Sequence, residues 1–243
     1  MIETWGDDFR SKTLLSGGSA GAVFALGIAL GKSPNYMSNL YRTVSEKCKK
    51  HGTLGNCSYF LEEELLILLE DPLAYKQIEG KCVLGTTAYF SKHRWHLSWG
   101  DNKDLLTCIK GSCHIPLYCG YGDRVMGVEV VDGAYAFSGE HLPHGDDTLY
   151  VGIDPHAEIT REFTNTEMVF PSVGEDFDNI VESGYKAFLS WNGNMNKKVG
   201  KRLPNYQALI VLWILKFIEI VVVKLKYVCN FFRAPVLIKT TRN

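Results

Sequence analysis

The chain of 243 residues is 46% hydrophobic and 12% aromatic, a composition that can bury one substantial core and hardly two. Its formal net charge of -1 is unevenly distributed: residues 1–192 carry 16 basic and 26 acidic side chains, whereas residues 193–243 carry 10 basic and 1 acidic. A basic, apolar tail favours an anionic lipid surface over nucleic acid as partner. We therefore expect a catalytic-sized domain over 1–192 and a membrane- or lipid-droplet-associating tail over 193–243.

The seven cysteines are odd in number and lack C-x-x-C spacing, and the first residues carry neither the basic region nor the apolar run of a signal peptide. This pattern argues against disulfides and secretion and predicts a cytoplasmic protein. Histidines pair at 93/96 and at 141/144 without further ligands at a suitable spacing. The sequence therefore predicts no metal site and no cofactor.

The hydrophobic pattern predicts strands that alternate with helices. The predicted elements, in chain order, are a strand over 12–16, a buried helix over 20–30, an amphipathic helix over 34–51, a helix over 59–71, strands over 81–90 and 95–99, a helix over 102–111, strands over 124–131 and 148–153, and a helix over 177–189. Such alternation is typical of an α/β domain with three layers, in which helices cover both faces of a mostly parallel central sheet. Functional sites in such sheets gather at the carboxyl ends of strands.

The segment Gly17-Gly18-Ser19-Ala20-Gly21 fits the G-x-S-x-G pattern of a nucleophile elbow, between a predicted strand and a predicted helix. Glycines at 17 and 21 remove Cβ atoms that would collide where the strand end packs on the helix start. The helix N-terminus behind Ser19 offers N–H groups, that of Ala20 among them, to a developing negative charge. A glycine-rich structural turn is the alternative interpretation.

The best-placed base for Ser19 is Asp132, which follows the predicted strand over 124–131 and precedes Gly133 and Ala134. A serine hydroxyl is a poor nucleophile at neutral pH and needs a base within hydrogen-bond reach. The small residues after Asp132 allow a tight turn with little obstruction by side chains. An ordinary turn aspartate is the alternative interpretation.

Together these two motifs resemble the patatin-like phospholipase family, which is marked by a G-x-S-x-G elbow and a later D-G-G or D-G-A turn. The block from Cys113 to Gly120, followed by Val130-Val-Asp-Gly133, is similar to the animal subgroup that includes adiponutrin and adipose triglyceride lipase. The resemblance covers roughly residues 10–190. It implies a lipid acyl hydrolase for phospholipids or acylglycerols, with Ser19 as nucleophile and Asp132 as base.

A Ser-Asp-His triad is the second interpretation of the same residues. In this arrangement Ser19 and Asp132 would be followed in the chain by His141, His144 or His156. An Asp-Gly-Ala turn directly after a strand fits the dyad of the patatin-like family better than it fits the acid loop of a triad.

The sequence departs from that family before the elbow. Patatin-like domains begin with a strand and a glycine-rich loop whose N–H groups form the oxyanion hole, whereas this chain has only Gly6 before Ser16. We therefore expect an N-terminally incomplete domain, through truncation, or a homologue that has lost the activity. Loss of one oxyanion donor costs about 10² to 10³ in rate. The alternative function is a catalytically weak or inactive lipid-surface binding protein.

The tail contains the most hydrophobic stretch of the chain, over 207–232. Its charged residues gather on one arc of a helical projection, which predicts an interfacial helix with Phe217 and Val221 on the apolar side. Basic residues on either side, within 197–233, would lie among anionic headgroups. A last core helix or strand and a single membrane span are the two alternatives.

Overall fold

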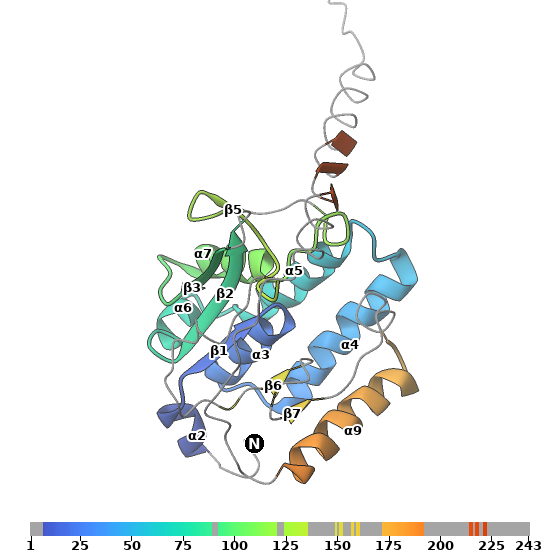
Figure 1. The fold of residues 1–243 in the computed structure, drawn as a ribbon. Helices are drawn as coiled ribbons and strands as arrows, with labels where there is room; N and C mark the ends of the chain where they lie inside the picture. The colour runs from blue at the N-terminus through green and yellow to red at the C-terminus, as the bar shows by residue number, and fades with distance from the viewer. Residues whose placement is uncertain are drawn as a thin grey trace, which may run out of the picture.

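The computed structural model describes residues 7–88, 92–120, 124–135, 149, 151–152, 157, 159–160, 172–191, 214–215, 217–218 and 221–222. Within them the chain folds as a mixed α/β protein (Figure 1). Its elements, in chain order, are α2 (Asp7–Lys12), β1 (Leu15–Gly18), α3 (Ala20–Ala29), α4 (Pro34–His51), α5 (Cys57–Leu68), α6 (Ala74–Gln77), β2 (Cys82–Ala88), β3 (Lys92–His96), α7 (Asn102–Ser112), β4 (Arg124–Val125), β5 (Val128–Val131), β6 (Val151–Gly152), β7 (Ile159–Thr160) and α9 (Glu175–Ser190).

The main sheet mixes both strand directions. β1 is parallel to β2, whereas β3 and β5 are antiparallel to β2 and β4 is antiparallel to β5. The prediction of a mostly parallel sheet is therefore wrong for these strands. The connections explain why, because a parallel pair needs a crossover of about a dozen residues and the short links from β2 to β3 and from β4 to β5 cannot provide one.

The strand predicted over 124–131 is a tight hairpin. Met126 and Gly127 separate β4 from β5 with φ values of 50° and 76°. Two consecutive residues with positive φ are typical of the two-residue hairpin turns that match the twist of the flanking strands. β5 therefore delivers Asp132 at the end of a hairpin.

The pairing register brings the ends of β1 and β5 together. β1 pairs with β2 up to Gly18 opposite Gly85, and β5 pairs with β2 from Val131 opposite Thr87. β3 pairs with the same stretch of β2 and therefore occupies its other edge. β1 and β5 consequently lie end to end along one edge of β2 and run toward each other, so Ser19 and Asp132 meet opposite Thr86.

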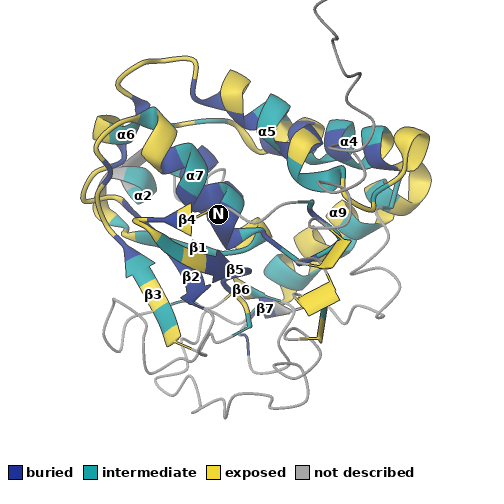
Figure 2. Ribbon diagram, turned by 90° about the horizontal axis from the view of Figure 1, so that it is seen from above, coloured by how far each residue is buried: buried dark blue, intermediate teal, exposed yellow. Residues whose placement is uncertain are grey.

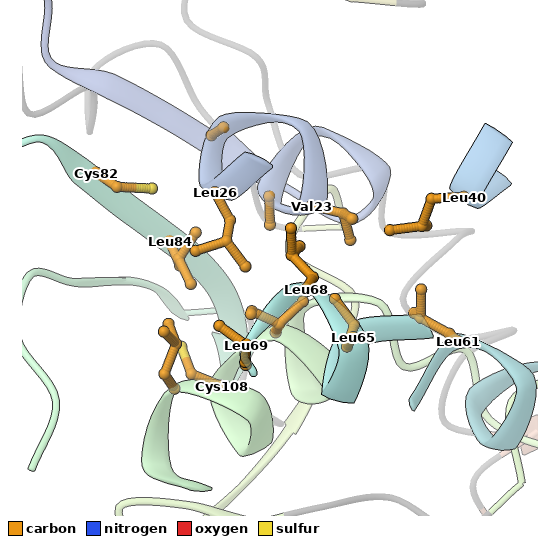
Figure 3. Close-up of a cluster of buried hydrophobic side chains, with 14 of the residues drawn as sticks. Val23, Leu26, Leu40, Leu61, Leu65, Leu68, Leu69, Cys82, Leu84 and Cys108 are labelled. Carbon is orange, nitrogen blue, oxygen red and sulfur yellow. The ribbon is translucent and has the colours of Figure 1, made fainter. Parts of the chain in front are cut away.

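Helices cover one face of this sheet and build the main core there (Figure 2). Figure 3 shows side chains of α3, α4, α5, β2 and α7 pointing toward one another. The labelled residues are Val23, Leu26, Leu40, Leu61, Leu65, Leu68, Leu69, Cys82, Leu84 and Cys108. Val83 and Thr87, which alternate to the other face, are also buried. The described residues do not place a second helical layer, so the three-layer architecture stays a prediction.

The predicted helices begin and end within about three residues of their expected bounds, and α4 and α7 have side-chain caps at their N-termini. The hydroxyl of Ser33 accepts from the Tyr36 N–H at 3.1 Å, and α4 ends before Gly52. Asp101 caps α7 in the same way, through the Asp104 N–H at 2.8 Å. Strand bounds differ more. β1 begins three residues later than predicted, since Lys12 ends α2 and residues 13–14 link it to the strand, and β3 covers Lys92–His96 instead of 95–99.

The predicted tail lies outside the described residues apart from six positions. Among these, Ile214, Phe217, Ile218, Val221 and Val222 are all exposed. In the described part of the chain, no helix has both the length and the apolar character needed to cross a membrane.

Candidate active site

The elbow places Ser19 on a sharp bend between β1 and α3. Ser19 has φ 56° and ψ -134°, a backbone conformation that residues other than glycine rarely adopt and that costs about 1–3 kcal/mol. A Cβ on residue 17 would lie 2.2 Å from the carbonyl oxygen of Gly21, so only glycine fits there. A Cβ on residue 21 would meet nothing within 4 Å. The expectation that both glycines are needed is therefore correct for Gly17 and wrong for Gly21.

The Ser19 side chain is directed at Asp132 instead of capping its own helix. Ser19 stands at the N-cap position of α3 but makes no side-chain cap hydrogen bond. Its Oγ donates to Oδ2 of Asp132 at 2.5 Å. Ser19 is only partly buried, whereas the carboxyl group of Asp132 that it contacts is buried. The nucleophile is thus more accessible than its base, which is shielded from water.

The Asp132 turn is fixed by backbone hydrogen bonds. The Asp132 N–H donates to the carbonyl of His114 at 2.8 Å, and the Gly133 N–H donates to the carbonyl of Ser112 at 2.9 Å. Oδ1 of Asp132 accepts from the Ala134 N–H at 2.9 Å. A Cβ on residue 133 would lie 2.3 Å from the carbonyl oxygen of Gly85. Glycine at 133 therefore lets the turn rest directly on β2.

Burial raises the pKa of Asp132 toward a value that suits a general base. The residue is 3% exposed, and burial raises the pKa of its carboxyl from the ordinary 3.8 to about 6. The hydrogen bonds from Ser19 and from the Ala134 N–H oppose that rise because they stabilise the carboxylate. At neutral pH the carboxylate form dominates and can accept the Ser19 proton. A base whose pKa lies close to the working pH is favourable for proton transfer.

The start of α3 is held by α4. The Tyr41 hydroxyl donates to the carbonyl of Ala20 at 2.8 Å, and the Tyr41 ring stacks on Phe24 with centroids 4.7 Å apart. The Ala20 and Gly21 amides open the helix, where backbone N–H groups have no intrahelical acceptor. They are the candidate donors for an oxyanion formed at Ser19.

Ser112 is a site residue that sequence reasoning missed. Its Oγ accepts from the Ser19 N–H at 2.9 Å and donates to the carbonyl of Gly85 at 2.6 Å. The signal available in the sequence is its spacing, because Ser112 continues the helical series Leu105, Cys108 and Ile109 on the buried face of α7. A polar side chain on such a face must find a buried partner.

The other candidate residues lie elsewhere. His141, His144 and His156, the candidates for a triad, lie outside the described residues. His96 is buried with Nε2 2.9 Å from Oγ1 of Thr86. Within the described ranges, no three His, Cys, Asp or Glu side chains are grouped so that they could hold a metal ion. A surface hollow of about 530 Å³ is lined by Ala88, Lys92, Arg94, Arg124, Gly127, Val128 and Glu129, and therefore not by the Ser19–Asp132 pair.

The chain matches no protein-family model and no curated protein. The geometry of the site and the motifs in the sequence are therefore the basis for a proposed function.

Proposed function

We propose that the protein is a serine lipid esterase of the patatin-like type, which cleaves carboxylic esters of phospholipids or acylglycerols through Ser19 and Asp132. The observation that carries this proposal is the contact of 2.5 Å between Ser19 Oγ and Asp132 Oδ2. It joins a partly buried serine on a strained elbow to a buried carboxyl group, across 113 residues of sequence. Nucleophile and base within hydrogen-bond reach are the requirement for acyl transfer to a serine.

The proposed reaction has two halves. Asp132 takes the Ser19 proton while Oγ attacks the ester carbonyl carbon, and the Ala20 N–H donates to the resulting oxyanion. The tetrahedral intermediate then collapses, and the alcohol leaves with the proton from Asp132. In the second half Asp132 takes a proton from water while the hydroxide attacks the acyl-serine carbonyl carbon. Asp132 then returns that proton to Ser19 Oγ as the bond to the acyl group breaks, which releases the fatty acid and free Ser19.

Lipid as the substrate class is supported by the tail. Five of its six described residues, all large and apolar, are exposed between 38% and 67%. The flanking segments carry Lys197, Lys198, Lys201, Arg202 and Arg233. An apolar surface beside basic residues binds at the boundary of an anionic membrane. We therefore propose a cytoplasmic protein that associates peripherally with membranes or lipid droplets.

One observation favours the alternative function, a lipid-surface binding protein with little or no activity. The described residues just before β1 form the helix α2 and place no glycine-rich loop there. A glycine-rich loop at this place would supply further oxyanion donors, and loss of one such donor costs about 10² to 10³ in rate.

Hydrolysis assays distinguish the two functions. The substrates are a short-chain fluorogenic ester, phosphatidylcholine vesicles and a triacylglycerol emulsion. We expect Ser19→Ala and Asp132→Asn each to lower turnover by about 10³-fold or more, whereas Ser16→Ala, on the adjoining strand, keeps it. Turnover by Ser19→Ala equal to that of the wild type would overturn the esterase assignment. Vesicle binding without turnover by the wild type would establish the alternative.

Vesicle sedimentation tests the tail separately. Replacement of Phe217 and Val221 by Asp should abolish binding to anionic vesicles, because both side chains are exposed on the apolar arc. Replacement of Lys197, Lys198, Lys201 and Arg202 by Gln should weaken binding by about 1 kcal/mol per charge at most. Aggregation of the protein after deletion of 203–243 would instead assign this stretch to the core.

A further inference from the structure

Ser112 connects the three segments that meet at the dyad. It is the last residue of α7 and is fully buried. Its hydroxyl contacts the elbow at the Ser19 N–H and β2 at the Gly85 carbonyl, and its own carbonyl accepts from the Gly133 N–H in the turn of the base. One residue therefore binds both the nucleophile segment and the base segment to the central strand.

We propose that Ser112 is a positioning residue whose hydroxyl holds the Ser19 backbone in the conformation that directs Oγ onto Asp132. The importance of Ser112 for catalysis rests on the proposed function, whereas its effect on the Ser19–Asp132 contact does not. Ser112 does not touch the reacting atoms and acts through Ser19.

The hydrogen-bonding capacity of the hydroxyl supports this role. A serine hydroxyl has one O–H to donate, and here it goes to the Gly85 carbonyl at 2.6 Å, which leaves the oxygen lone pairs to accept from the Ser19 N–H at 2.9 Å. Because Ser112 is fully buried, solvent cannot replace either interaction. Removal of the hydroxyl leaves the Ser19 N–H and the Gly85 carbonyl without this partner. The loss falls on Ser19, whose backbone is already strained.

The two kinds of contact at Ser112 can be separated by substitution. Ser112→Ala removes the hydroxyl but keeps the backbone carbonyl that binds the Gly133 N–H. The Asp132 turn should therefore stay in place while the elbow is released. Ser19 Oγ then no longer donates steadily to Asp132, and the carboxylate loses a hydrogen bond that stabilises its charged form.

The test is an NMR titration of the Asp132 side-chain carboxyl carbon, assigned by its disappearance in Asp132→Asn. Ser19→Ala gives the pKa without the serine donor, which should be higher than in the wild type. Thr86→Val is the matched control. Thr86 follows Gly85 on β2, and the substitution removes a buried hydroxyl that is bonded to His96 on β3. We expect the pKa in Ser112→Ala to move from the wild-type value toward that of Ser19→Ala, and Thr86→Val to titrate as the wild type does.

A wild-type pKa in Ser112→Ala would overturn the positioning role, and so would an equal shift in Thr86→Val. Ser112→Cys provides a second variant if the alanine form does not fold, because a thiol fills the site but bonds weakly. It should give an intermediate pKa, and a wild-type value there contradicts the proposal equally. In an active protein, Ser112→Ala should lower kcat about 10- to 100-fold with KM unchanged. A shifted pKa with no turnover in any form would leave the positioning role standing and refute the esterase.

Discussion

The two turns that form the dyad are built in opposite ways. Ser19 is only partly buried, has a positive φ of 56°, and is held by the Ser112 hydroxyl, which belongs to another segment. Asp132 is buried in a turn whose amides are bound to the carbonyls of His114 and Ser112. The strained backbone of Ser19 keeps the nucleophile accessible. The burial of Asp132 is unfavourable for its charged form and therefore raises its pKa. Each cost is located where the proposed chemistry needs it.

The glycines beside each turn should give the largest effects. Gly17→Ala and Gly133→Ala place a Cβ 2.2 Å and 2.3 Å from backbone oxygens, which cannot move aside as a side-chain end can. We expect each to destabilise the protein by about 3 kcal/mol or more, measured by urea denaturation. Gly21→Ala is the control: it meets nothing within 4 Å and lies in the first turn of α3, so it should be neutral or stabilising. An equal loss in all three would contradict the local account.

Removing the charge of the base should stabilise the protein at neutral and alkaline pH. The folded-state pKa of Asp132 is raised to about 6 from 3.8, so the folded state binds the proton more tightly than the unfolded state does. The stability that the bound proton of Asp132 contributes is therefore complete below about pH 4 and is lost as the pH rises through about 6. The difference in unfolding free energy between Asp132→Asn and wild type should grow by up to about 3 kcal/mol from pH 4 to pH 8. A difference independent of pH would show that the carboxyl is not strained by burial.

The pH dependence of acylation should report the same group. Asp132 must be ionised to accept the Ser19 proton, and its pKa is about 6. Below that pH, kcat/KM for a neutral ester should fall about tenfold per pH unit, and above it the rate should level off. Stopped-flow hydrolysis of a fluorogenic ester between pH 4.5 and 8 measures this profile. A midpoint close to 4 would mean that Asp132 is solvated in the working protein.

The smallest effect is expected at the support of the elbow helix. Tyr41→Phe removes the hydrogen bond to the Ala20 carbonyl but keeps the ring that stacks on Phe24. Thermal unfolding should show a loss of about 1 kcal/mol, and turnover should change less than it does in Ser112→Ala. A loss of turnover as large as that of Ser19→Ala would mean that α4 shapes the site more than the Ser112 contact does.

The sequence predicted the parts of this site that depend on local rules. Ser19 and Asp132 each stand in a turn with its own glycine signature, and Ser33 and Gly52 mark the ends of α4 by capping chemistry. Strand direction was harder to predict from the sequence. The alternation of strands and helices suggests a parallel sheet, but the short connections between neighbouring strands make these strands antiparallel. Ser112 was missed because its partner in the elbow lies 93 residues away, and no local pattern indicates a bond across that separation.

The most direct measurement of the central claim is mapping of the serine that a fluorophosphonate probe modifies. The intact protein is labelled, digested and analysed by mass spectrometry, in parallel with Ser19→Ala, Asp132→Asn and Ser16→Ala. The Ser19–Asp132 dyad predicts a single modified serine at position 19, slower labelling in Asp132→Asn, and unchanged labelling in Ser16→Ala. Equal labelling of the Ser19→Ala protein, or modification of another serine in the wild type, would contradict the account.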